Sequence, residues 1–126
     1  MGTADQGSPS PQASVTPSPS ELARGSVWNF CYLDNDDPKP VVIVSNDGRN
    51  RSRFEWVHVV RITTRPKRPL PTIVELAEGD APLTGRAMVD ELELVHKDDL
   101  EERRGMLGPP TMHKIDAALR RVLALE

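Results

Sequence analysis

The sequence predicts a small, mainly β domain that ends in one α-helix. From residue 26 to residue 95, short runs of β-branched and aromatic residues alternate with turn-forming Gly, Pro, Asn and Asp, which is the pattern of short strands. Beyond Pro110 the apolar residues recur at helical spacing instead. The chain has 126 residues, which suits one domain of ordinary size and leaves no room for a second.

Five strands are expected in chain order. The first covers residues 26–33 and is followed by a turn at residues 34–38. Residues 41–44 form a continuous apolar run that is too short for a helix, which favours a strand buried on both faces at the centre of the sheet. The third, fourth and fifth strands are expected at residues 56–64, 72–76 and 85–95.

The fifth expected strand contains a change of phase. Ala87 and Val89 point one way, whereas the later apolar pair, Leu92 and Leu94, has the opposite parity. The alternation must therefore shift near Asp90. A β-bulge is the usual cause and is frequent beside active sites, although twist at a barrel corner explains the same pattern without function.

The C-terminal segment is expected to be helical. Residues 110–125 place their apolar side chains on one stripe, with Pro110 in the first turn and two arginines near the C-terminal end of the helix dipole. A second short helix is expected at residues 100–104, before Gly105. Five short strands with a terminal amphipathic helix suggest a small SH3-like β-barrel, in which closure removes the exposed edges.

The N-terminal segment and the cysteine content narrow the class of protein. Residues 1–22 are rich in Ser, Pro, Gly, Thr and Ala, so a disordered tail is expected. No segment resembles a secretory signal or a membrane span, which predicts a cytoplasmic protein with no membrane partner. The single cysteine, Cys31, excludes an internal disulfide, and no ligand cluster indicates a metal site or another cofactor.

Charge is unevenly distributed along the chain. The net charge is −3, so the whole molecule does not attract nucleic acid. Residues 49–68, however, contain seven Lys and Arg residues and one acidic residue, Glu55. In residues 75–102, most of the charged residues are Asp or Glu. The basic run is either a solvated loop or a face that receives phosphates.

Five pieces of the chain, read in order, resemble the MazF/PemK toxin family. They are Arg24-Gly25-Ser26-Val27-Trp28, the run from Lys39 to Asp47, Ile62-Thr63-Thr64-Arg65, the run from Asp90 to Leu100 and the helix from Met112 to Leu123. The resemblance covers residues 23–126 and leaves the Ser/Pro tail outside the toxin domain. It implies a MazF/PemK/CcdB-like barrel.

The resemblance also implies a function. Members of the family are homodimeric, metal-independent endoribonucleases that cut single-stranded RNA at short sequences and leave 2′,3′-cyclic phosphate and 5′-hydroxyl ends. Each toxin is neutralised by a cognate antitoxin whose acidic, disordered C-terminal tail occupies the RNA groove. Such cleavage needs the 2′-hydroxyl in line with the phosphate, proton transfer at both oxygens and positive charge on the non-bridging oxygens.

The resemblance assigns two catalytic residues. Lys39 stands at the basic position before the proline that opens the second strand, where the family usually has Arg as acid/base and phosphate clamp. Lys is a point charge whereas Arg is a rigid fork. Thr63 matches a hydroxyl residue at the end of the third strand that hydrogen-bonds the phosphate. The first turn, residues 34–38, is shorter than the loop that covers the active site in many relatives.

Further residues are expected to contact RNA through the same resemblance. Asp90 and Glu91 stand where the family reads bases, since a carboxylate accepts a hydrogen bond from an exocyclic amine. The remaining RNA-binding candidates are Trp28, Asn29, Asn46, Thr64 and Arg65.

Other interpretations compete with these assignments. Trp28 and Phe30 fit the core or the dimer interface of a small barrel as well as they fit base stacking. The whole protein could instead be a non-catalytic barrel that binds antitoxin or nucleic acid, or a DNA gyrase poison like the related CcdB toxins. Those toxins use residues at the end of the last helix, including a Trp, and this chain ends without an aromatic residue.

Overall fold

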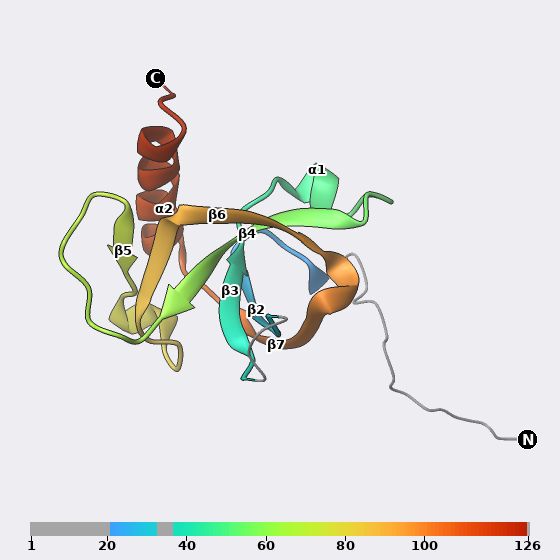
Figure 1. Cartoon of the computed structure of the whole chain (residues 1–126), viewed down its shortest axis with the longest axis horizontal. Helices are drawn as coiled ribbons and strands as arrows, with labels where there is room; N and C mark the ends of the chain where they lie inside the picture. The colour runs from blue at the N-terminus through green and yellow to red at the C-terminus, as the bar shows by residue number, and fades with distance from the viewer. Residues whose placement is uncertain (1–20, 33–36, 126) are drawn as a thin grey trace, which may run out of the picture.

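The computed structural model describes residues 21–32 and 37–125, and its main feature is one antiparallel sheet of six strands. The strand order is β5-β6-β4-β3-β2-β7, and the sheet curves strongly (Figure 1). The strands are β2 (Ser26–Phe30), β3 (Lys39–Ile43), β4 (Trp56–Thr63), β5 (Ile73–Glu75), β6 (Arg86–His96) and β7 (Leu100–Met106). The helices are α1 (Asp47–Asn50), α2 (Pro109–Val122) and the single 3₁₀ turns η2 (Glu78–Asp80) and η3 (Lys97–Asp99).

The mainly β class with a C-terminal helix is confirmed, but two details of the prediction are wrong. Residues 100–104 do not form a helix, because they belong to β7, which pairs with the outer edge of β2 through two register shifts. This pairing buries Leu100 to 2 % exposure and outweighs the helical propensity of the Glu and Arg residues that follow. The sheet also stays open, since β5 and β7 are its two edges and do not pair with each other in the described residues.

Two apolar clusters fill opposite faces of the sheet. In β4, Val57 and Val59 belong to the cluster inside the curve, whereas Val60 and Ile62 belong to the cluster beneath α2. The predicted phase shift in β6 is confirmed, because Arg61 pairs with Met88 while Val59 pairs with Glu93. The extra residues of β6 form a bulge there.

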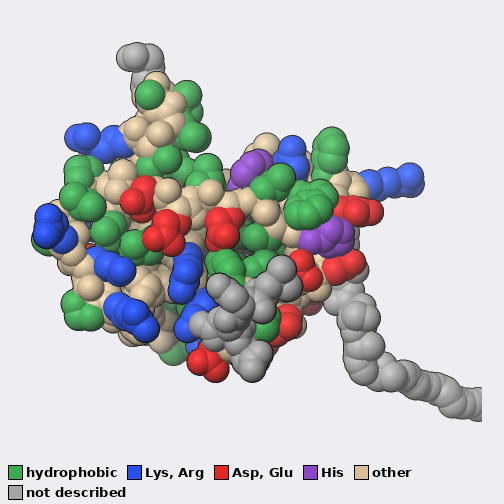
Figure 2. All heavy atoms as spheres, viewed as in Figure 1, with side chains coloured by type: hydrophobic (Ala, Val, Ile, Leu, Met, Phe, Trp, Pro, Cys, Tyr) green, Lys and Arg blue, Asp and Glu red, His purple; other side chains and the backbone are tan. Residues whose placement is uncertain are grey.

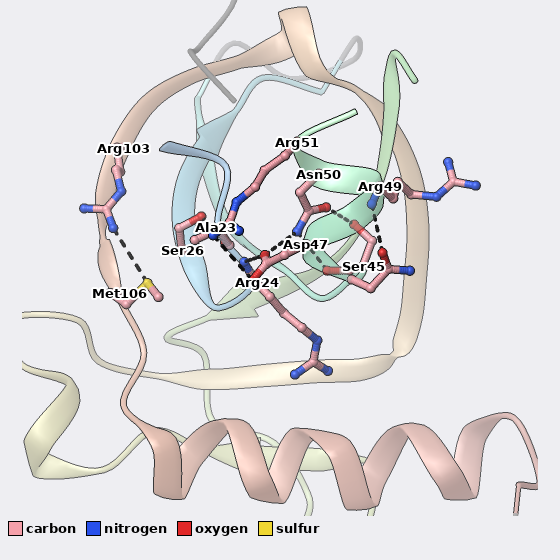
Figure 3. A network of polar contacts seen from close by, with 11 residues as sticks. Ala23, Arg24, Ser26, Ser45, Asp47, Arg49, Asn50, Arg51, Arg103 and Met106 are labelled. Carbon is pink, nitrogen blue, oxygen red and sulfur yellow. Dashed lines mark hydrogen bonds and ion pairs between the residues drawn. The ribbon is translucent and has the colours of Figure 1, made fainter. Parts of the chain in front are cut away.

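Polar contacts of Arg24 fix the first described residues to both helices, and Figure 3 shows the contact with Asp47 of α1. The Arg24 backbone N–H donates to Asp47 Oδ1 at 2.7 Å, and its guanidinium donates to Asp116 Oδ1 on α2 at 2.6 Å. Leu22 is only 1 % exposed, so the packed domain includes the last residue of the predicted tail. Residues 1–20 and most of the predicted turn at 34–38 lie outside the described residues.

Asp80 connects η2 to the N-terminus of α2. It is 2 % exposed, and its carboxylate accepts hydrogen bonds from the backbone N–H groups of Ala77 and Gly108 and from the Thr111 hydroxyl. Burial alone would raise the pKa of Asp80, but these three hydrogen bonds together hold it below its ordinary value.

Replacing Asp80 with Ala should lower the free energy of unfolding by about 3 kcal/mol, because three donors lose their partner. Since the folded-state pKa is depressed, this stabilisation is complete above the unfolded pKa of about 4 and is lost as the pH falls from there through the lower folded-state pKa. Urea unfolding at pH 7 and pH 3.5 measures both effects. The difference between wild type and Asp80→Ala should shrink at pH 3.5, and the exposed-site control Glu101→Ala should show neither effect. An equal difference at both pH values would contradict the role of the ionised carboxylate.

Candidate active site

The sheet forms a concavity of about 360 Å³ where β3 begins and β4 ends. Its lining includes Lys39 and Thr63, the two residues that sequence analysis assigned to catalysis. Val41 pairs with Arg61 in the antiparallel register of β3 and β4. Lys39 lies two residues before Val41 and Thr63 lies two residues after Arg61, so the same register places Lys39 opposite Thr63. Side chains in such opposed positions are neighbours on one face of the sheet.

Strand alternation explains why these side chains share a face. Val41 and Ile43 of β3 and Val57 and Val59 of β4 are buried inside the curve, and residues at every second position point the same way. Lys39 and Thr63 continue these two rows beyond the apolar cluster, so a packed core holds the strands that carry them. Both side chains are half-buried.

The Thr63 hydroxyl has a defined orientation. Its Oγ1 accepts a hydrogen bond from the backbone N–H of Arg65 at 3.2 Å. Because a hydroxyl carries one donor and two acceptor positions, the proton of Thr63 remains available to an oxygen in the concavity. Thr64 and Arg65 also line the concavity and are exposed.

Positive charge dominates the lining. Of the described residues that line it, four are cations and one, Glu91, is a carboxylate. In Figure 2 the Lys and Arg side chains gather on this face below a row of Asp and Glu side chains. The cations are Lys39, Arg61, Arg65 and Lys67. A concavity of this charge and size is suited to a phosphate.

Arg61 and Lys67 were not among the predicted site residues, although both belong to the basic run. Arg61 could have been found from the strand period, because it lies two residues before Thr63 and therefore on the same face. Lys67 lies in the loop after β4, where no period applies, and only the fold brings it to the concavity.

Several predicted RNA-binding residues lie elsewhere. Trp28 is 4 % exposed, and its indole N–H donates to Ser26 Oγ at 3.0 Å. Its ring is therefore part of the core, and the prediction that Trp28 contacts RNA is wrong. Asn29 is held by Glu102 and Arg104 on the neighbouring strand β7, outside the residues that line the concavity.

Two further candidates differ in their placement. Asn46 follows the opposite end of β3 from Lys39, and its side chain accepts the backbone N–H of Arg49 as the N-cap of α1. In the β6 bulge, Glu91 lines the concavity, whereas Asp90 is exposed and does not line it. The bulge thus turns the second of the two predicted carboxylates, and not the first, toward the candidate site.

The described residues contain no group of three or more His, Cys, Asp and Glu side chains arranged to hold a metal ion. Within the same residues, no helix has the length and apolarity needed to cross a membrane.

Comparison with known proteins identifies the family. Residues 24–123 match the model of the PemK-like, MazF-like toxins of type II toxin–antitoxin systems. The chain belongs to this toxin family. It is 44 % identical to the endoribonuclease MazF1 of Mycobacterium bovis over 102 aligned residues. The aligned region covers 81 % of this chain and 92 % of that protein. The endoribonuclease MazF4 of Mycobacterium tuberculosis matches to the same extent.

Solved structures agree with the family assignment. An endoribonuclease from a mycobacterial species, in complex with its cognate antitoxin, superposes with a TM-score of 0.74 at 41 % identity over 82 % of this chain and 96 % of that chain. Another structure of an endoribonuclease from a mycobacterial species gives a TM-score of 0.72 at 42 % identity over 82 % of this chain and 91 % of that chain. The MazE–MazF complex of Deinococcus radiodurans, at 16 % identity and a TM-score of 0.69 over 89 % and 99 %, shares the fold.

Proposed function

We propose that this chain is the toxin of a type II toxin–antitoxin pair and that it cuts single-stranded RNA at the concavity between Lys39 and Thr63. The observation that carries the proposal is the meeting of these two side chains, from separate strands, on one cation-lined face. Family membership and relatives that are endoribonucleases support the same conclusion.

The proposed reaction is a transesterification at phosphorus. The 2′-hydroxyl gives up its proton to water as its oxygen attacks the adjacent phosphate, and the bond from phosphorus to the 5′-oxygen breaks. The products are a 2′,3′-cyclic phosphate and a 5′-hydroxyl. Lys39 donates a proton to the leaving 5′-oxygen, and the Thr63 hydroxyl donates a hydrogen bond to a non-bridging oxygen. Thr64 and Arg65 extend the contact along the RNA backbone, and Glu91 accepts from an exocyclic amine of a base.

The proposed partners follow from the family. One is a cognate antitoxin with an acidic tail, which would compete with RNA for the same cations. The other is a second copy of this chain, since Phe54, Trp56 and Leu94 are between 46 % and 62 % exposed and provide apolar surface that an interface would cover. The proposed place of action is the cytoplasm, where messenger RNA and the antitoxin are made.

RNA cleavage with chemical analysis of the ends tests the proposal. Purified protein with EDTA present should cut a long single-stranded RNA and leave cyclic phosphate and 5′-hydroxyl termini, because the proposed chemistry uses protein cations alone. A duplex of the same sequence serves as the control and should stay intact. Cleavage that EDTA stops would contradict the metal-independent mechanism, and intact RNA beside gyrase trapped on cleaved plasmid would replace the proposed function with gyrase poisoning.

A further inference from the structure

Arg61 is a cation of the concavity whose side chain has defined neighbours. It lies in the interior of β4, opposite Val41 of β3, and between the buried residues Val60 and Ile62. Its side chain is half-buried and lines the same concavity as Lys39 and Thr63. A cation carried by a paired central strand has less freedom than one in a loop.

An aromatic ring holds the guanidinium in place. The Arg61 Cζ atom lies 5.2 Å from the centroid of the Tyr32 ring, which is cation–π distance. Tyr32 is itself fixed on two sides, because its hydroxyl donates to Glu93 Oε1 at 2.5 Å and its ring packs against Phe30 with centroids 4.7 Å apart.

The same contacts leave the Arg61 donors available. Glu93 accepts from the Tyr32 hydroxyl, and none of the ion pairs among the described residues involves Arg61. Burial raises the pKa of Tyr32, and the hydrogen bond to Glu93 raises it further, so the phenol stays protonated and continues to donate. Within the described part of the chain Arg61 therefore has no carboxylate partner, and a half-buried guanidinium that faces a concavity is suited to bind an anion.

We propose that Arg61 is a catalytic residue that clamps the non-bridging oxygens of the scissile phosphate, with Tyr32 and Glu93 as positioning residues. The inference rests on the proposed ribonuclease function. It assigns phosphate binding and proton donation to two different cations. A guanidinium binds two phosphate oxygens as a planar fork, whereas an ammonium group cannot. Arg61 therefore supplies the fork, and Lys39 supplies the mobile proton.

Two measurements on each variant test this assignment. The first is the single-turnover rate on a defined RNA, and the second is the affinity for the same RNA with a 2′-deoxy nucleotide at the cleaved position. Arg61→Ala should lower the rate by about 100-fold or more but weaken affinity by less than about 10-fold, since the clamp acts mainly on charge that develops in the transition state. Arg61→Lys should recover only part of the rate, because it restores the charge without the fork.

Chemical rescue separates the clamp from a merely structural role. Millimolar guanidinium should raise the rate of Arg61→Ala, whereas an equal concentration of sodium chloride should not. Tyr32→Leu should lower the rate by about 10-fold through loss of the ring, and Tyr32→Phe, which keeps the ring, should lose less. The exposed α2 variant Arg120→Ala removes the same charge away from the concavity and should match wild type.

The outcomes distinguish this inference from the proposed function. If wild-type protein leaves the RNA uncut, both the proposed ribonuclease function and the proposed role of Arg61 are wrong. If wild type cuts and Arg61→Ala cuts at the same rate, the clamp alone is wrong. Equal losses of rate and affinity without guanidinium rescue would also overturn it, because they describe a residue that only binds the RNA backbone.

Discussion

Replacing Lys39 with Ala should reduce RNA cleavage by about 1,000-fold or more, because the site then loses its proposed proton donor and a cation proposed to bind the phosphate. Lys39 lies opposite Thr63 at the edge of a packed core, and truncating its half-buried side chain leaves the strand pairing intact. The measurement is the single-turnover rate on a defined RNA, with thermal unfolding to confirm that the variant is folded.

Two companion variants define the role of this cation. Lys39→Arg should recover only part of the activity, since arginine retains the charge at this position but gives up its proton far less readily than lysine. Lys114→Ala, on the exposed side of α2, removes a charge elsewhere and should cut normally. A Lys39→Ala protein that retains half of the wild-type rate would show that the proton comes from another group.

Replacing Gly85 with Ala should damage both stability and cleavage. Gly85 has φ of +117°, and a Cβ atom added there would lie 2.4 Å from the backbone carbonyl oxygen of Thr63. That carbonyl belongs to the end of β4 and cannot move without moving the Thr63 hydroxyl. We expect the free energy of unfolding to fall by about 3 kcal/mol, and a shift of about 1 Å at Thr63 to slow cleavage by about 100-fold.

Gly79 provides the matched control for this substitution. It lies in η2, and an added Cβ there would meet no atom within 4 Å. Gly79→Ala should therefore leave both urea unfolding and cleavage at wild-type values. Unfolding of Gly85→Ala at the wild-type urea concentration would contradict this prediction. It would show that β4 and β6 can separate enough to fit a Cβ atom beside the Thr63 carbonyl oxygen.

Most of the fold was predictable because each strand carries its own local signal. The apolar run at residues 41–44 and the phase shift near Asp90 were visible without coordinates, since they reflect a period of two residues. The strand β7 was not, because Leu100 is followed by Glu and Arg residues of good helical propensity. Its pairing with β2 depends on a strand edge formed by residues about 75 positions earlier. A local sequence pattern cannot indicate a pairing between such distant residues.

The site was predictable to a smaller extent. Lys39 and Thr63 were proposed through the family resemblance, and the register between their strands explains why both line the concavity. Trp28 was misassigned because an aromatic residue in a strand looks the same in sequence whether its face is inside or outside. Arg61 was overlooked as one member of a basic run, since its distinguishing contact with Tyr32 crosses from one strand to the end of another.

The separation of the two apolar clusters has a practical consequence. Helix α2 packs against β5 and β6 on one side of the sheet, while the cation-lined concavity opens on the side continuous with the inner cluster, and none of its lining residues comes from α2. Substitutions on the solvent-facing surface of that helix should therefore leave the chemistry across the sheet unchanged.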